Sequence, residues 1–559
     1  MKYILRLMAL LLTLCLLVTS LSSCLAYIRI MEVLSEETEA AEGGDGGEEN
    51  QPDADANVNP YLQFTLTEDD EIRFYELLEK CEELTMVGTD SASIERAWVA
   101  LEKQYYHIGT QVNIARILYD QNLKNEKRSE NYLFASELIE TVYQSYMELC
   151  QAIDASNSPY RDTFFEDWTD EQLSEMRSYT EQVSNLKLAN EKLMMDAREL
   201  DVKKDSQKYR ELYREFVKNN NQMARALGYS NYYAYATKDI YMRDFGPLER
   251  RNLRLNVKNY LVPLCKKALE MYEASVKKLS NQDRKRLGAI LDDAYNELPK
   301  DYIALYLERL GGSTEREMES LFDANNSIFS DSSYSYEGAY TAYLYEYERP
   351  LCYFGPSYQN SWTVIHEMGH FYAAKYMPYD MINLDIAELH SQGNEMLFLA
   401  QLEDELDQLY QPVVCYQLYS MLANIIVATI IDDFEEQVYC SAITSGVANL
   451  DFEDIMDTVE QQYGGVSFVS DYITDMTLYW KYVAIESPVY YLSYATSGVV
   501  ALSLYADARQ NFDGAVLSYR KLCEETIPMS GFLQALTVAG LDSPFQRATY
   551  EDLRTLLPQ

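Results

Sequence analysis

The sequence predicts a mainly α-helical protein with one small β-region. Apolar residues recur at three- and four-residue steps along most of the chain from about Leu66 onward. Proline and glycine are sparse, at 14 and 22 of 559 residues, as long helices require. One aromatic-rich stretch breaks this pattern with partial alternation. We see no fixed repeat period and no linker after Pro60, and we divide the body into an N-terminal helical part, 60–300, and a C-terminal part, 301–559.

The N-terminus has the features of a lipoprotein signal peptide over residues 1–23. Two basic residues precede the apolar run Leu7–Val18, which is too short to span a bilayer comfortably. The sequence Leu21-Ser-Ser-Cys24 then resembles a bacterial lipobox, in which the cysteine carries lipid after cleavage. The alternative is a plain secretory signal with an incidental cysteine. We therefore expect Cys24 to be lipidated and the protein to be extracytoplasmic, anchored to the bacterial cell membrane by this lipid.

Residues 24–59 predict a flexible acidic tether between the lipid and the body. Ser35–Asn59 is acidic, contains glycine and proline, and has almost nothing to bury. The whole chain carries a formal charge of -42 with a pI near 4.4. This charge excludes nucleic acid as a partner and disfavours contact of the folded surface with anionic lipid, because both need basic patches. Nine cysteines less Cys15 and Cys24 leave seven without close spacing, which excludes a disulfide framework.

Helical periodicity defines the predicted elements on both sides of the aromatic-rich stretch. In the first part we expect helices over Glu71–Leu84, Ile94–His107, Asn131–Ile153, Asp170–Met195, Tyr209–Asn219 and Asn252–Leu279. In the second part we expect helices over Ile386–Leu406, Pro412–Cys440, Phe452–Tyr463, Tyr472–Ala484, Val489–Asp507 and Gly514–Glu525, and short helices within Met529–Leu557.

The aromatic-rich stretch Ser332–Phe354 predicts two or three short strands. They lie directly before the segment that carries the strongest chemical signal of the chain. A strand beside an active site can align a peptide substrate by backbone pairing. A hairpin that only packs in the core explains the pattern equally well.

That signal is His366-Glu367-Met368-Gly369-His370, within a predicted amphipathic helix, Ser361–Met377, that ends before Pro378. Three of the four histidines of the chain lie between positions 366 and 390. On a helix, His366 and His370 are one turn apart on the same face and can bind one Zn²⁺, while Glu367 can act as a base on a water molecule. The segment therefore predicts a zinc hydrolase with one zinc ion per chain.

A third zinc ligand is expected downstream, within Leu384–Phe398. We assign Glu388, which lies 18 residues after His370 on a second predicted helix. His390 is a rival third ligand, although two residues after Glu388 it faces roughly the other way, which leaves it as a neighbour of the site. Glu395 or Asp385 would hold a ligand histidine in the required tautomer.

With these residues, the chain resembles the thimet oligopeptidase and oligopeptidase F family of zinc metallopeptidases. The H-E-x-G-H core and the sequence from Glu388 to Glu395, E-L-H-S-Q-G-N-E, are the specific matches. Gly338-Ala-Tyr340 and Pro350-Leu-Cys-Tyr353 are similar to the strand region of the family. The resemblance covers the chain from about Gly228 onward. It implies Glu388 as the third ligand and a large helical, zincin-like bowl or clam with the site deep in a channel that admits oligopeptides.

A second region of resemblance, Ser487–Thr496, is similar to the tyrosine segment whose hydroxyls face substrate and oxyanion in that family. The candidates are Tyr490, Tyr491 and Tyr494, of which we favour Tyr491 and Tyr494. Family members commonly carry a histidine shortly before these tyrosines, and this chain has none after His390. The packed face of an aromatic helix is the alternative explanation for each tyrosine.

The leading functional hypothesis is therefore a lipid-anchored zinc metalloendopeptidase that hydrolyses oligopeptides. Water activated by Glu367 would attack the scissile carbonyl, and a tyrosine hydroxyl would stabilise the oxyanion. The alternatives are a peptide-binding lipoprotein with impaired catalysis and a zinc exopeptidase. The sequence does not indicate an oligomeric state.

Overall fold

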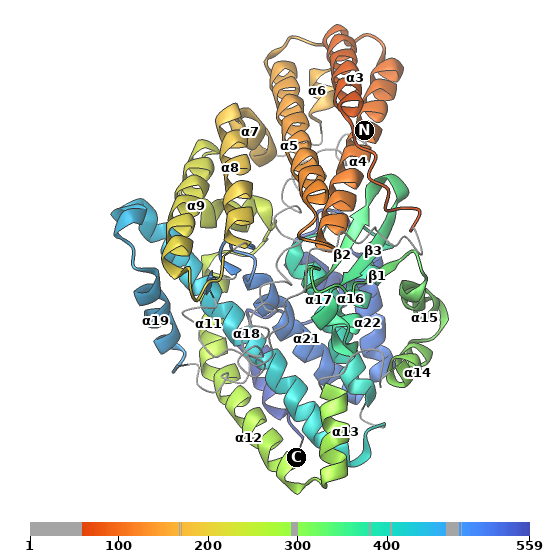
Figure 1. The fold of residues 1–559 in the computed structure, drawn as a ribbon, viewed down its shortest axis with the longest axis vertical. Coiled ribbons are helices and arrows are strands. Elements are labelled where there is room, and N and C mark those ends of the chain that lie inside the picture. Colours follow the sequence, from red (N-terminus) through yellow and green to blue (C-terminus); the bar gives the residue numbers. More distant parts are fainter. Residues whose placement is uncertain are drawn as a thin grey trace, which may run out of the picture.

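The computed structural model describes residues 59–558, apart from 167, 169, 199, 292–299, 379–381, 403–404, 466–479 and 482. It confirms the predicted fold class: the protein is mainly helical, with one small three-stranded sheet (Figure 1). The predicted signal peptide, the lipidation site Cys24 and all but the last residue of the acidic tether lie outside the described residues. Most of the predicted helix Tyr472–Ala484 lies outside them too.

The N-terminal helices α3 (Glu68–Val87), α4 (Ser91–Asp120) and α5 (Glu126–Ala155) pack against one another at the top of Figure 1. Local signals fix their ends. Thr67 and Asp70 form a capping box at the start of α3, and Gly88 ends it in the left-handed conformation, with φ 67°. These helices are longer than the periodicity predicts, because the caps lie outside the buried apolar residues that carry the pattern.

The predicted helix Asp170–Met195 is divided in the structure into α7 (Asp170–Ser178) and α8 (Glu181–Arg198). The side-chain amide of Gln151 on α5 donates to the carbonyl oxygens of Met176 and Tyr179, both at 2.7 Å. A long-range side chain thus satisfies carbonyls that a continuous helix would have paired internally. Helices α8 and α9 (Ser206–Ala226) then pack side by side (Figure 1).

The sheet has the order β1-β3-β2, with β1 Ser327–Phe329, β2 Ala339–Leu344 and β3 Arg349–Phe354. Strand β2 is antiparallel to β3, and β1 is parallel to it. Every residue of β2 is buried, because α4 covers one face of the sheet and helix α16 (Ser361–Ala374) packs against the other. Two strands, β2 and β3, lie within the predicted stretch Ser332–Phe354. Strand β1 lies wholly upstream of it and was not predicted, because its three residues are too few to show an alternating pattern.

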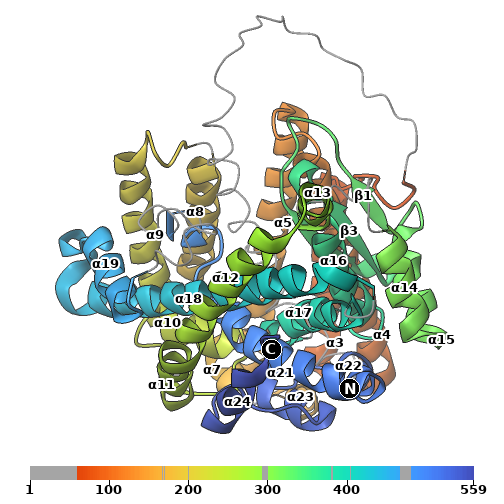
Figure 2. The same cartoon turned by 90° about the horizontal axis from the view of Figure 1, so that it is seen from below.

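The centre of the molecule consists of α16 (Ser361–Ala374), α17 (Leu384–Gln401), α18 (Tyr410–Ser441), α21 (Leu492–Gln510) and α22 (Phe512–Glu525). Helix α17 lies between α16 and α21, and α18 crosses the molecule beside them (Figures 1 and 2). Among the described residues, one helical stretch, Asp407–Asn449, is long and apolar enough to cross a membrane by length and composition, and 83% of its most apolar window is buried within the protein.

The remaining elements enclose this centre. Three helices between 281 and 319 were not predicted from the sequence; each has at most 11 residues. The remaining helices of at least four residues are α6 Arg161–Phe164, α10 Tyr232–Tyr235, η3 Ala236–Ile240, α11 Pro247–Asn256, η4 Val257–Leu261, α12 Val262–Lys278, α13 Asn281–Leu291, α14 Lys300–Leu310, α15 Gly312–Glu319, η11 Ala442–Gly446, α19 Phe452–Gln462, α23 Phe532–Ala539 and α24 Arg547–Asp552.

Candidate metal centre and active site

Two buried helices bring the predicted metal ligands together. Helix α16 begins at the Asn360 cap, whose side chain accepts from the backbone N–H of Thr363 at 2.9 Å. Its glycine, Gly369, lies against α17 so closely that a Cβ there would be 2.4 Å from the carbonyl oxygen of His390. Only a glycine permits this approach, and the approach places Glu388 of α17 opposite the two histidines of α16.

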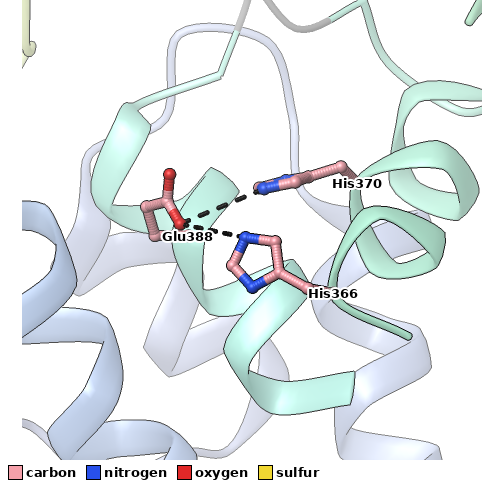
Figure 3. A group of neighbouring side chains, drawn as sticks. All are labelled: His366, His370 and Glu388. Carbon is pink, nitrogen blue, oxygen red and sulfur yellow. Dashed lines mark ion pairs between the residues drawn. The ribbon is translucent and has the colours of Figure 1, made fainter. Parts of the chain in front are cut away.

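His366, His370 and Glu388 meet at one point (Figure 3). Oε2 of Glu388 lies 3.8 Å from Nε2 of His366 and 4.0 Å from Nε2 of His370, and all three donor atoms lie within 4.8 Å of one another. These separations are too long for hydrogen bonds. The separations of 3.8 and 4.0 Å suit ligand atoms that each lie about 2.0–2.2 Å from one zinc ion, and two imidazoles with one carboxylate are a common donor set for catalytic zinc. The residues present therefore fit the ion.

The protonation states of both histidines also suit metal binding. Nδ1 of His366 lies 2.6 Å from Oε1 of Glu395, so a proton held on Nδ1 leaves Nε2 as the donor atom towards Glu388. Burial, with additional effects of His366 and His390, holds the pKa of His370 well below its usual value. His370 is therefore neutral, which is the form that binds a metal ion.

Glu367 is almost fully buried beside the ligands, with 1% of its surface exposed. Burial raises its pKa to about 7, against the lowering effects of His366 and of a hydrogen bond from Thr341. The Thr341 hydroxyl, on β2, donates to Oε2 of Glu367 at 2.8 Å. A carboxyl group that titrates near neutrality and is held by one fixed donor is suited to general-base chemistry.

Two of the candidate tyrosines, Tyr490 and Tyr491, lie in the turn before α21, and Tyr494 lies in the first turn of that helix. The hydroxyl of Tyr490 donates to Oε1 of Glu388, so this tyrosine contacts the third candidate ligand. Tyr494 lies edge to face against both Tyr490 and Tyr491, with ring centroids 5.4 and 5.5 Å away. Burial raises the pKa of Glu388 to about 7. Tyr490, which we did not favour from the sequence, is thus the tyrosine with a direct contact to the candidate ligand set.

Asp385 and His390 do not join the donor group of three. The carboxylate of Asp385 accepts from Nε of Arg243 at 3.0 Å and from the hydroxyl of Thr496, so it connects α17 to other segments. His390 is buried, and burial lowers its pKa to about 3. Of the two carboxylates predicted to hold a histidine, Glu395 has that contact.

Sequence reasoning missed two residues of this environment, Thr341 and Arg243. Thr341 lies in the predicted strand region, but nothing in the sequence links a strand threonine to a helix glutamate 26 positions later. Arg243 lies 142 residues before its partner Asp385. A buried arginine has no local signature, since it is recognised only by the acceptors around it.

Comparisons with known proteins place the fold. Pz peptidase A with an inhibitor has 16% identity and a TM-score of 0.67, over 88% of this chain and 96% of that one. A protein from Bacillus anthracis str. Ames assigned as an oligoendopeptidase F has 17% identity and a TM-score of 0.66, over 88% and 95%. Oligoendopeptidase F from Enterococcus faecium has 13% identity and a TM-score of 0.55, over 88% and 98%.

No protein-family model and no curated protein matches the chain. At these identities the structural likeness shows the fold alone. The chain thus has the fold of the oligopeptidase F and Pz peptidase metallopeptidases over most of its described length, with His366, His370 and Glu388 gathered where a metal ion fits.

Proposed function

We propose that the protein is a zinc metalloendopeptidase that hydrolyses peptide bonds in oligopeptides. One observation carries the proposal: the donor atoms of His366, His370 and Glu388 lie within 4.8 Å of one another, with Glu367 buried next to them. The likeness of the fold to oligopeptidase F and Pz peptidase supports a peptide substrate. His366, His370 and Glu388 would hold one zinc ion per chain.

The side chains of the site have distinct roles in this proposal. When bound, zinc supplies Lewis-acid polarisation and lowers the pKa of a water molecule. Glu367 takes a proton from the attacking water and passes it to the leaving amine. Tyr490 and Glu395 hold Glu388 and His366 in place. The oxyanion donor would be Tyr491 or Tyr494, on the same segment.

The cellular location is part of the proposal. The basic and apolar N-terminal sequence and the lipobox-like Leu21–Cys24 support lipidation at Cys24 after removal of residues 1–23. The acidic tether up to Asn59 would hold the enzyme away from the bilayer, and the peptides would be extracytoplasmic. Labelling with a radioactive fatty acid tests this directly: incorporation that is lost in Cys24→Ala supports the anchor, and incorporation retained in that variant contradicts it.

The activity is tested with quenched peptides of graded length, with and without chelator, and with zinc measured by mass spectrometry. We expect one zinc per chain and chelator-sensitive hydrolysis. Glu367→Gln should abolish turnover while retaining zinc, whereas Glu388→Ala should lose zinc and turnover together. A fully active Glu367→Gln protein would refute the mechanism. Mass-spectrometric mapping of the products separates internal cleavage from the exopeptidase alternative.

One observation favours a second candidate, a peptide-binding lipoprotein with impaired catalysis. Members of the oligopeptidase F family commonly carry a histidine shortly before the tyrosine segment, and this sequence has no histidine after His390. This candidate predicts that wild-type protein binds zinc and oligopeptides but does not cleave them. Calorimetric binding to the same peptides, measured beside the hydrolysis assay, distinguishes the two functions.

A further inference from the structure

Two backbone segments that are distant in sequence lie beside the helix that carries Glu388, and each contains a strained residue. Met242 has φ 47° and Val489 has φ 65°. Val489 is β-branched and fully buried, and such a side chain rarely adopts the left-handed region. Strained residues of this kind persist only where the surrounding contacts fix them, and they concentrate at functional sites.

Arg243 makes most of the contacts that fix the second segment. Its guanidinium, completely buried, donates to the carbonyl oxygen of Val489 at 3.1 Å, to that of Tyr490 at 3.4 Å and to the hydroxyl of Ser493 at 3.0 Å. The fourth contact is the ion pair with Asp385 at 3.0 Å. If Arg243 served only to neutralise Asp385, the ion pair with Asp385 would be sufficient. Instead, three of its four bonds hold the turn and the start of α21.

Other buried groups complete the restraint of this turn. The hydroxyl of Tyr241 donates to the carbonyl oxygen of Pro488 at 2.7 Å, and the N–H of Val489 donates to Oε1 of Glu435 at 2.9 Å. Asn383, the N-cap of α17, donates to the carbonyl oxygens of Tyr241 and Met242, each at 2.8 Å. The peptide carbonyls on both sides of the strained residue Met242, directly before Arg243, are therefore held by the N-cap of the helix that carries Glu388.

The result of these contacts is a fixed distance between Tyr490 and Glu388. Asp385 and Glu388 lie three residues apart on α17, about one turn of the helix. Arg243 bonds both to Asp385 and to the backbone of Tyr490, while the hydroxyl of Tyr490 bonds to Glu388. The four residues therefore form a closed loop, through three hydrogen bonds and the backbone of α17, that includes the third candidate metal ligand.

We infer that Arg243 is a positioning residue: it holds the strained turn at Pro488–Tyr490 so that the hydroxyl of Tyr490 stays on Glu388 and fixes the carboxylate for the metal. The inference deepens the proposed function and rests on it for the kinetic readout. The metal affinity of the site provides a second readout that does not need turnover. Partners that orient a metal ligand commonly change affinity or activity by about 10- to 100-fold when removed.

The test is a double-mutant cycle with Arg243→Lys and Tyr490→Phe. A lysine cannot reach four acceptors at once. We expect each single variant to raise the zinc Kd and lower kcat by about tenfold or more, with KM nearly unchanged. The double variant should lose no more than the worse single variant, because both substitutions act through one hydroxyl. Arg116→Lys, a buried arginine paired with Asp120 on α4, is the matched control and should retain both values.

Some outcomes would overturn the inference, and a different one would refute only the proposed function. Losses that multiply in the double variant, or wild-type zinc affinity and kcat in Arg243→Lys, would overturn the inference. Wild-type protein that binds zinc but cleaves no peptide would refute the proposed function alone, and the zinc affinities would still test Arg243. If Arg243→Lys fails to fold, Tyr490→Phe alone decides, because it removes the hydroxyl through which Arg243 is inferred to act on Glu388. A zinc Kd equal to wild type in that variant would overturn the inference.

Discussion

Replacing Thr341 with valine tests the placement of the proposed general base. The substitution removes the hydroxyl that donates to Oε2 of Glu367 at 2.8 Å and keeps the shape of the side chain. Both residues are almost fully buried, with 3% and 1% of their surfaces exposed, so water does not readily replace the lost donor. Glu367 would then be free to turn away from the attacking water.

The magnitude follows from the hydrogen bond. A bond to a charged group contributes about 1.5–3 kcal/mol, and about 1.36 kcal/mol changes a rate tenfold, so kcat should fall about 10- to 150-fold. The Thr341 bond also lowers the pKa of Glu367, which stands at about 7. Its removal raises that pKa, and because the base must be ionised, the acid limb of the kcat profile should move to higher pH.

The assay measures kcat, KM and zinc content with a quenched peptide across the neutral pH range. Thr341→Ser retains a hydroxyl and should recover most of the activity. Thr314→Val is the matched control, because Thr314 is a fully buried threonine of α15 whose hydroxyl lies 3.3 Å from that of Tyr372. A Thr341→Val enzyme with full zinc and kcat within about twofold of wild type would refute the reasoning.

Three further predictions concern the metal centre. Gly369→Ala should lower the free energy of unfolding by about 1–3 kcal/mol or prevent folding, whereas Gly288→Ala, in helix α13 where a Cβ meets nothing within 4 Å, should leave it unchanged or raise it in the same denaturant titration. Glu395→Ala should raise the zinc Kd about 10- to 100-fold in a chelator competition, since His366 loses its partner; an unchanged Kd would exclude this role. Because the pKa of Glu388 is about 7 before metal binds, protons compete for it, and the zinc Kd should rise as the pH falls below 7; a flat Kd from pH 8 to 6 would contradict this.

The sequence by itself predicted the fold class and the composition of the candidate metal centre. Helical periodicity and sparse glycine and proline are local properties, so the mainly helical body with one small strand region follows from them. The spacing of His366 and His370 places both on one helix face, and the motif around Glu388 indicates the third ligand. The signal peptide, the lipidation of Cys24 and the acidic tether remain predictions.

The tertiary structure decided what surrounds these ligands. It brings Thr341 to Glu367, Tyr490 to Glu388 and Arg243 to the turn at Pro488–Tyr490. The partners are separated by 26 to 247 residues in the sequence. Such partners have no sequence signature, because a hydrogen bond depends on where the chain returns in space. The same holds for the break between α7 and α8, which Gln151 stabilises from another helix. The local sequence pattern therefore indicates which residues can bind a metal ion. Long-range packing determines which other groups form hydrogen bonds to those residues.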